Sequence, residues 1–550
     1  QTIMSTDTHD QSTNLNESGP VETSQLPTSE SETDGYLVTE GQVQKLDEHD
    51  GIHEDKKISD EVEAVIDTRV GWDNPEFRTK FFASSIGNVL EWYDFAIFGY
   101  FAREIGSTFF PLSDSGNSSG IEGNGTHTEF TAEAELLDSF IVFGVAFFVR
   151  PIGGVMFGYI GDRLGRKKAL ELSIVLMLVP SFLMGFIPGF GSIGYMATVL
   201  LILVRLCQGL ACGGELVGAF IYIVESSPRK SRGMWGAACF GAAIFGTALG
   251  AAVGVGIREA CAGVQVDNIY GKGDMLTVIG WRIAFWMSMI LGIIGVLLRR
   301  QLGDSTEFKK MLDDEKEEED HERPSPIRAV IVNHWREVML TLGHTSLWTT
   351  VFWLSFVWLA SFSESLTEVD EENDAGDSPF LVSLCCQMFT VFLFPFVGAI
   401  SDRVGQVPVM MLGSLLIFAG AIPIFMLLSD GRIIYYATGQ ACFAFCLALI
   451  GAPLPIWMCE RFSIEHRYTG MGISYNLAQA IFGGPAAAIA TALSDVTVIT
   501  DYNYEDSYGL TPALYIMFVA LIALGSGAIG YFREKRTGME SEPLLGGKAV

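Results

Sequence analysis

The chain has 550 residues, of which 49% are hydrophobic and only 18% are charged, and its mean hydropathy is +0.33. Because soluble proteins carry about 25% charged residues, this composition excludes an ordinary soluble globular protein and indicates a polytopic membrane protein. The formal net charge of −29 fits this reading, since residues 1–80 alone contain 19 Asp and Glu against 6 Lys and Arg.

The first 78 residues are rich in Ser, Thr, Asp and Glu and have almost no apolar periodicity. Such a segment cannot bury enough surface to offset the entropy lost when it becomes ordered. We therefore expect a disordered acidic tail that is free to bind a cytosolic partner.

Twelve segments that follow are predominantly apolar over about 20 residues, the length needed to cross a bilayer. They cover residues 82–108, 135–157, 169–189, 196–222, 234–257, 281–298, 339–362, 380–400, 408–428, 433–457, 469–493 and 512–532. An even number of spans places both termini on one side of the membrane. Loops on that side, with the C-terminal tail, hold 22 Lys and Arg against 3 in the opposite loops. The positive-inside rule therefore predicts cytosolic termini.

The spans predict an all-α polytopic membrane protein, and the internal repeat described below predicts that it is built from two pseudo-symmetric six-helix bundles. Its expected parts are the N-terminal tail 1–78, a first bundle 79–298, a charged cytosolic linker 299–338, a second bundle 339–532 and a cytosolic C-terminal tail 533–550.

The first span carries Glu91 and Asp94, which lie three residues apart and therefore on one helix face. Ionisable groups at bilayer depth are costly and indicate function. Two carboxylates this close cannot both ionise cheaply in a low-dielectric site. One is expected to hold a proton near neutral pH, as a proton-coupling site requires. The alternative is that they cap the helix or pair with Arg150 of the second span.

Two predicted outer loops are free of basic residues. Loop 111–134 contains two N-glycosylation acceptors, Asn117 and Asn124. Loop 363–379 carries seven carboxylates, which form either a solvated acidic loop or a vestibule that attracts cations.

The loop after the second span, Gly-Tyr-Ile-Gly-Asp-Arg-Leu-Gly-Arg-Lys-Lys at 158–168, is echoed 240 residues later by Gly-Ala-Ile-Ser-Asp-Arg-Val-Gly-Gln at 398–406. The repeat predicts two halves related by duplication. We interpret these turns as a conformational latch, whose charges pair with neighbouring helix ends, rather than as plain positive-inside turns. The residues assigned to the latch are Asp162, Arg163, Arg166, Glu215, Glu225, Asp402, Arg403 and Glu460.

The fourth span carries a polar stripe of Arg205, Gln208, Cys212 and Glu215 along one helix face. Arg205 offers a planar fork of donors that suits a carboxylate, so we assign Arg205 and Gln208 to substrate binding. The alternative for Arg205 is a structural salt bridge to Glu91 or Asp94. Glu215 lies about 15 Å further along the helix axis, which places it near the cytosolic end.

The second half adds a polar stripe in the eleventh span, where Tyr475, Asn476 and Gln479 are assigned to substrate oxygens. In the seventh span Trp348, Trp353 and Trp358 could line a site for a quaternary ammonium group. Aromatic side chains that face lipid are the preferred interpretation of these three residues.

The sequence contains no phosphate-binding loop, metal-ligand cluster or nucleophile elbow. Its nine cysteines give no disulfide or metal framework. We therefore expect neither an enzyme nor an ATP-driven pump, with the proton as coupling ion, no other cofactor and no nucleic-acid partner. Nothing in the sequence defines the oligomeric state. The string at 540–545 resembles an acidic dileucine signal, so an endosomal, lysosomal or vacuolar membrane is the alternative to the preferred plasma membrane.

The 158–168 loop resembles the signature loop of the major facilitator superfamily, and further strings resemble its metabolite:proton symporter family. These strings are Gly-Asn-Val-Leu-Glu-Trp-Tyr-Asp-Phe at 87–95, Arg-Pro-Ile-Gly-Gly at 150–154, the Arg205 to Glu215 stripe, Gly-Trp-Arg at 280–282, and Tyr-Asn with Phe-Gly-Gly between 475 and 484. The resemblance covers about residues 78–535 and implies a twelve-helix fold and coupled transport. Family members carry proline, betaine, 2-oxoglutarate, citrate or shikimate.

The chain departs from this pattern at Gln406 and Val407, which replace basic residues and should weaken the second latch. The long tails and the sequon-bearing loop suggest a eukaryotic member. The resulting hypothesis is a proton-coupled symporter of a small carboxylate-bearing metabolite that works by alternating access. Arg205 tilts the expectation slightly toward organic acids over zwitterionic osmolytes. The rival hypothesis is a transporter-like nutrient sensor with little flux.

Overall fold

The computed structural model describes residues 72–110, 126–268, 270–303, 308, 325–359, 378–428, 432–496 and 510–537. The first helix shows how the local sequence directs the fold. Asn74 is the N-cap of this helix and its side chain accepts a hydrogen bond from the Glu76 amide at 2.9 Å, while Pro75 occupies the first helical turn.

The N-terminal half is helical apart from one small hairpin. Its elements are α2 (Pro75–Tyr100), α3 (Ala102–Phe109), α4 (Thr126–Arg163), α5 (Arg166–Met184), α6 (Phe190–Ile193), α7 (Tyr195–Ser226), the 3₁₀ turn η2 (Arg229–Ser231), α8 (Arg232–Cys261), β1 (Gln265–Asn268), β2 (Gly271–Asp274), the π-helix η3 (Leu276–Gly280) and α9 (Trp281–Arg299). The two strands pair antiparallel, with Gln265 opposite Asp274 and Asn268 opposite Gly271. This hairpin was not anticipated from the sequence.

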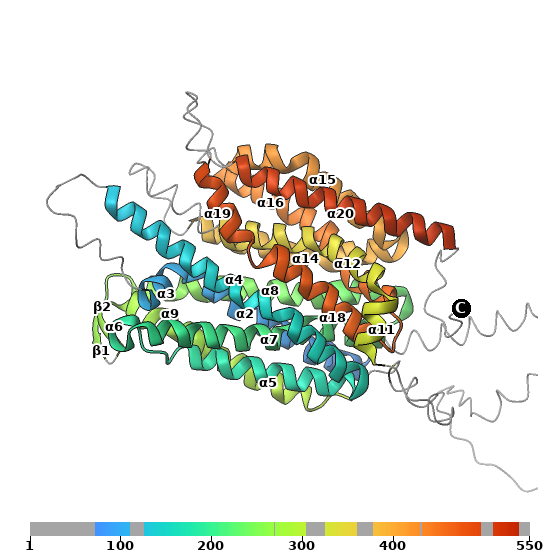
Figure 1. Ribbon diagram of the computed structural model, residues 1–550, viewed down its shortest axis with the longest axis horizontal. Helices are drawn as coiled ribbons and strands as arrows, with labels where there is room; N and C mark the ends of the chain where they lie inside the picture. Colours follow the sequence, from blue (N-terminus) through green and yellow to red (C-terminus); the bar gives the residue numbers. More distant parts are fainter. Residues whose placement is uncertain are drawn as a thin grey trace, which may run out of the picture. The chain divides into compact units, whose positions relative to one another are not determined.

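The C-terminal half follows a short linker helix. Its elements are α11 (Pro326–Asn333), α12 (Trp335–Trp353), the π-helix η4 (Leu354–Trp358), α14 (Ser378–Val404), α15 (Gln406–Leu428), α16 (Ile433–Gly451), α17 (Leu454–Arg461), α18 (Arg467–Ala478), the π-helix η5 (Gln479–Gly483), α19 (Ala486–Val496) and α20 (Leu510–Thr537). In Figure 1 the helices from α2 to α9 lie together, and those from α12 to α20 lie together beside them.

Each of the twelve predicted spans coincides with one of these helices or with two or three in succession. Within the described ranges, nine helical segments are long and apolar enough to cross a membrane. The helices α2, α5 and α12 are not among the nine, because they carry more charged and polar side chains. One of these three is α2, the helix that holds Glu91 and Asp94. A span that carries functional ionisable residues is expected to be less apolar than the others.

The two halves pack in a pseudo-symmetric way. The second helix of the first half, α4, packs against α18, and the fifth, α8, packs against α14. The repeat maps α4 onto α14 and α8 onto α18, so the two contacts are exchanged by the duplication. Glycines let these backbones approach closely: a Cβ added at Gly154 would lie 2.5 Å from the Gly472 carbonyl, and one at Gly398 would lie 2.6 Å from the Gly233 carbonyl.

The two repeated loops also share their backbone conformation. Gly165 has a φ of 111° and Gly405, 240 residues later, has a φ of 99°. L-residues rarely adopt such angles. The glycine of each loop is therefore required to turn the chain between two antiparallel helices.

Candidate functional site

The helix α2 carries Glu91 and Asp94 into the interior, where both side chains are fully buried. Glu91 accepts a hydrogen bond from the Arg150 guanidinium of α4 at 2.5 Å. Arg150 also donates from Nε to Oδ1 of Asn476 in α18 at 3.2 Å, and Asn476 donates to the Gly213 carbonyl of α7 at 2.5 Å. This chain of contacts joins a carboxylate of the first half to a helix of the second.

Asp94 belongs to a second polar group, formed with α7 and α5. Gln208 donates from Nε2 to Asp94 Oδ2 at 2.6 Å and is 3.0 Å from the Ser181 hydroxyl. Arg205 donates from Nη1 to Gln208 Oε1 at 3.1 Å, and the same nitrogen is 3.7 Å from Asp94 Oδ2. The Arg205 guanidinium lies over the Phe98 ring, 3.6 Å from its centroid. Arg205 is thus held by a hydrogen bond, a long ion pair and an aromatic face.

The two carboxylates therefore engage different arginines, whereas the sequence pattern suggested one shared carboxylate site. The alternatives considered from the sequence, pairing of Glu91 with Arg150 and of Asp94 with Arg205, are both realised. Each group keeps free bonding capacity among the described residues: Oε2 of Glu91, Oδ1 of Asp94, and Nε and Nη2 of Arg205 have no hydrogen-bond partner. The two carboxylate oxygens can accept a proton, and the two guanidinium nitrogens can donate to a small polar molecule.

The polar stripe of α18 is also buried. Asn476 contacts Arg150, as described above, and Gln479 begins the π-helix η5. Gln479 donates from Nε2 to the Tyr475 hydroxyl at 2.7 Å, and its Oε1 accepts from the Thr349 hydroxyl and from Trp353 Nε1 at 3.1 Å. The stripe therefore connects α18 with α12 rather than facing lipid.

The tryptophans of α12 and η4 correct an expectation. Trp348, Trp353 and Trp358 are at most 2% exposed, so the interpretation that they face lipid is wrong. Trp353 stacks on Trp92 of α2 at 5.5 Å between ring centroids, with an interplanar angle of 11°. The rings of Phe95, Phe143 and Phe147 surround Trp353 at 5.2 to 6.0 Å. An aromatic wall thus lies next to the buried ionic groups, because Phe95 is also 5.7 Å from the Arg205 guanidinium.

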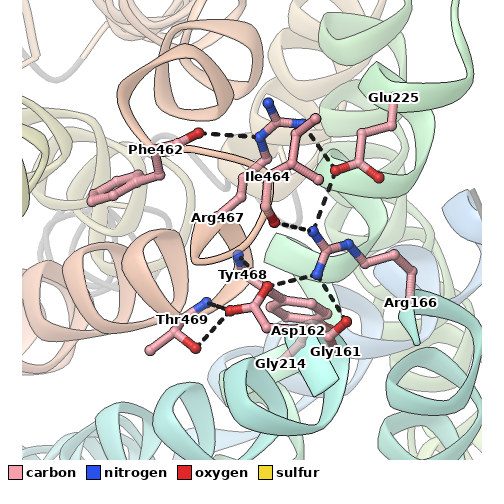
Figure 2. Close-up of polar contacts among 10 residues, drawn as sticks. All are labelled: Gly161, Asp162, Arg166, Gly214, Glu225, Phe462, Ile464, Arg467, Tyr468 and Thr469. Carbon is pink, nitrogen blue, oxygen red and sulfur yellow. Dashed lines mark hydrogen bonds and ion pairs between the residues drawn. The ribbon is translucent and has the colours of Figure 1, made fainter. Parts of the chain in front are cut away.

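The first latch loop binds the opposite half at the start of α18 (Figure 2). Asp162 pairs with Arg166 at 2.6 Å. The Asp162 carboxylate also accepts from the Tyr468 amide at 3.1 Å, the Thr469 amide at 2.9 Å and the Thr469 hydroxyl at 2.7 Å. A carboxylate at a helix N-terminus satisfies orphan amides and complements the helix dipole. Asp162 therefore caps a helix of the second half.

A second carboxylate extends this network. Glu225, at the end of α7, accepts from Arg467 at 2.9 Å and lies 3.4 Å from Arg166. Arg166 also donates to the Ile464 carbonyl at 2.8 Å. A side chain at Gly161 would overlap the Tyr468 ring, so this close approach requires glycine.

The second latch is simpler. Asp402 caps α8 by accepting from the amides of Gly233 at 2.7 Å and Met234 at 3.0 Å. Among the described residues Asp402 has no ion-pair partner, in line with Gln406 standing where the first loop has Arg166. Arg403 and Glu460 are exposed. Arg163 is partly buried at the end of α4.

The contacts of Glu215 lie within the first half. It pairs with Arg299 at the end of α9, where Arg299 Nη1 and Glu215 Oε2 are 2.8 Å apart and a second contact joins Nη2 to Oε1. Ser173 of α5 donates to the same carboxylate at 2.5 Å. All three residues belong to the first half, so the assignment of Glu215 to the latch between halves is not supported by its contacts.

We predict that Glu215→Gln lowers the stability of the protein more than it changes substrate binding. Removing one partner of a buried ion pair typically costs about 3–5 kcal/mol, because Arg299 keeps its charge without a carboxylate. The measurement is the melting temperature in detergent, with the exposed Glu259→Gln as control. An unchanged melting temperature would contradict a structural role for this pair.

Sequence reasoning missed several residues of the site. Arg150 was considered only as a possible partner, and Ser181, Arg299 and Arg467 were not singled out. Arg150 could have been found, because a buried arginine within an apolar span is itself unusual. The predicted acceptors Asn117 and Asn124, the seven carboxylates of the acidic loop, the N-terminal tail to residue 71 and the end of the C-terminal tail lie outside the described residues. Among the residues that the structure describes, no three His, Cys, Asp or Glu side chains are grouped as metal ligands would be.

Comparison with known proteins decides the family. Residues 80–522 match the family model described as "Sugar (and other) transporter". The chain belongs to this family of the major facilitator superfamily. Carriers, not enzymes, make up this family, so the expectation of a non-enzymatic, multi-pass membrane protein is confirmed.

The relatives of this transporter include the "Proline/betaine transporter" of Salmonella typhimurium, which is 29% identical over 83% of both chains. The "Ectoine/proline transporter ProP" of Corynebacterium glutamicum is 30% identical over 90% of this chain and 91% of its own. Among solved structures, the proton:xylose symporter XylE bound to 6-bromo-6-deoxy-D-glucose gives a TM-score of 0.61 at 15% identity, covering 84% of this transporter and 96% of that chain. The structural likeness establishes the fold, and the sequence relatives confirm the resemblance to metabolite transporters.

Proposed function

We propose that the transporter carries a small carboxylate-bearing metabolite together with protons, by alternating access between its two halves. The observation that supports this most directly is the pair of fully buried carboxylates, each engaged with a different arginine and each with one free oxygen. Charges at bilayer depth are retained where they serve transport. The free donors of Arg205 suit a carboxylate, which an arginine binds in a planar, bidentate way.

Proton coupling is assigned to Glu91 because its carboxylate pairs with Arg150. Protonation of Glu91 removes the negative partner of Arg150, and Arg150 also bonds Asn476 of the opposite half. A proton at this position therefore changes a contact between the halves. Asp94 is assigned to the same role through Gln208 and Arg205, which it orients.

The latch contacts hold one end of the protein closed during part of the alternating-access cycle. Asp162 and Asp402 each cap a helix of the opposite half, so both contacts must break when that end of the protein opens. The positive-inside rule predicts that this end is on the cytosolic side, which supports the proposal. We propose a plasma membrane location with both termini in the cytosol, and an endosomal, lysosomal or vacuolar membrane as the alternative.

A zwitterionic osmolyte is the substrate class that we favour over an organic acid. The named cargoes of the relatives are proline, betaine and ectoine, and each carries a carboxylate beside a cationic nitrogen. Arg205 provides a site for the carboxylate, and the Trp92 and Trp353 pair provides aromatic faces for the cation. An organic acid would use Arg205 without needing the aromatic wall.

Uptake into proteoliposomes with an imposed pH gradient tests the proposal. We expect radiolabelled proline or glycine betaine to accumulate, and a protonophore to abolish the accumulation. Accumulation of 2-oxoglutarate or citrate alone would favour the organic-acid class. Binding without accumulation of any of the four would support a nutrient sensor, which is the rival function.

We predict that Trp353→Leu separates these substrate classes. Loss of a cation–π contact in a desolvated site costs about 2 kcal/mol, so the apparent affinity for glycine betaine should fall about 30-fold. The affinity for an organic acid should change little. Competition binding against both ligands measures this, with Trp72→Leu as the control because Trp72 precedes α2 and is 43% exposed. An equal loss for both ligands would contradict the assigned role.

A further inference from the structure

The linker helix α11 and the first turn of α12 expose an unusual surface. Ala329 and Val330 of α11 are buried against the protein, whereas Ile331, Val332, Trp335 and Met339 are 52 to 62% exposed. These four exposed apolar residues lie close together in the chain on two consecutive helices, and we call them the α11 face. An exposed apolar patch of this kind indicates a contact with lipid or protein.

The depth of the α11 face follows from its neighbours. Glu337, in the first turn of α12, pairs with Arg533 of α20 at 2.7 Å. Arg533 is the last residue of the candidate span Thr511–Arg533. The adjacent Phe532 is 69% exposed, as expected for a lipid-facing side chain. Trp335 therefore lies at the level where membrane spans end, the position at which tryptophan is enriched in membrane proteins.

Two arginines flank the face. Arg328 and Arg336 are exposed, and the Arg336 guanidinium lies 5.5 Å from the centroid of the Trp335 ring. Neither has an ion-pair partner among the described residues. Arginines beside an apolar, tryptophan-bearing face are typical of helices that lie in the membrane interface and attract anionic lipids.

We infer that α11 lies in the membrane interface, with its apolar face in the bilayer and its arginines on the phosphates of anionic lipids. Bilayer lipid is the occupant because Glu337 ties the start of α12 to Arg533 of α20, next to the exposed Phe532 at the end of a membrane span. This places part of the predicted cytosolic linker in the membrane. Since α11 packs against both α4 and α18, the helices joined by the Asp162 latch, the bilayer would hold this helix where the two halves meet (Figure 1).

Fluorescence quenching in nanodiscs tests the inference. The signal of Trp335 is obtained as the difference between the wild-type protein and Trp335→Phe. We expect brominated lipids to quench this signal and aqueous iodide to leave it nearly unchanged. The double variant Ile331→Asn/Val332→Asn, whose changed side chains are already exposed, should reverse the order. Quenching of Trp335 by iodide alone would overturn the inference, and so would protection from both quenchers, which would indicate a second copy or another protein on this face.

The charge preference is a separate readout. Brominated phosphatidylglycerol should quench Trp335 more strongly than brominated phosphatidylcholine. Arg328→Gln and Arg336→Gln should each reduce this preference, by about fivefold in effective lipid affinity per arginine. Arg300→Gln, an exposed arginine outside the α11 face, is the matched control. Equal quenching of the wild-type protein by both lipids would overturn the assignment of the arginines.

Discussion

Replacing Glu91 with glutamine is expected to abolish proton-driven accumulation of substrate while substrate binding survives. Glutamine has nearly the shape of a protonated glutamate but cannot release a proton. The buried Arg150 then has no anionic partner, although it keeps Asn476. Loss of one partner of a buried charged pair is worth about 2–5 kcal/mol, so uptake driven by a pH gradient should fall about 30-fold or more.

The measurement combines two assays on the same reconstituted protein. Uptake under a pH gradient reports coupling, and exchange of labelled for unlabelled substrate at equal pH reports binding and alternation without net proton movement. Glu259→Gln is the matched control, because it changes an exposed carboxylate near the C-terminus of α8. Undiminished accumulation by Glu91→Gln would remove this residue from the coupling mechanism, and thermal stabilisation by substrate shows whether the variant is folded.

The second large effect concerns the unequal latches. Asp162→Asn should slow transport about tenfold or more, because it removes a charged hydrogen bond to Arg166 worth about 1.5–3 kcal/mol as well as part of a helix cap. Asp402→Asn should slow transport only about threefold, because Asp402 makes two backbone contacts that contribute about 0.5–2 kcal/mol as a cap.

A native cysteine can report the state of the latch. Cys212 is buried in α7, in the stripe that carries Arg205 and Gln208. Opening of the latch end should raise the rate at which Cys212 reacts with a small thiol reagent. The reaction of the same variants carrying Cys212→Ser is subtracted, because it reports the other cysteines. We expect a larger increase in Asp162→Asn than in Asp402→Asn. Equal rates in the two variants would show that the ionic network around Asp162 adds nothing to closure.

Gln406 underlies this asymmetry between the two latches, since the first loop has Arg166 at the equivalent position. The difference between Gln406 and Arg166 was visible in the sequence. Its consequence was not, because only the folded protein shows that Arg166 reaches Glu225 and the Ile464 carbonyl. The sequence therefore identified the weaker latch without showing what the stronger one binds.

The sequence alone determined the features that depend on local pattern. Apolar runs of span length, the excess of basic residues on one side and the 240-residue repeat predicted the helices and the two halves, because the bilayer requires each span to satisfy its own backbone hydrogen bonds. The burial of the Arg205, Gln208, Cys212 and Glu215 stripe likewise followed from helical periodicity.

Only the tertiary structure decided which groups meet. Helical spacing placed Glu91 and Asp94 on one face but could not show that the first pairs with Arg150 and the second with Arg205. Periodicity could not distinguish tryptophans facing lipid from tryptophans in the core, since both surroundings are apolar. The sequence assigned Glu215 to the latch, and only the folded protein shows that α9 brings Arg299 against it. Each of these outcomes depends on contacts between helices that are distant in the chain, and pairing across such distances leaves no periodic signal in a single sequence.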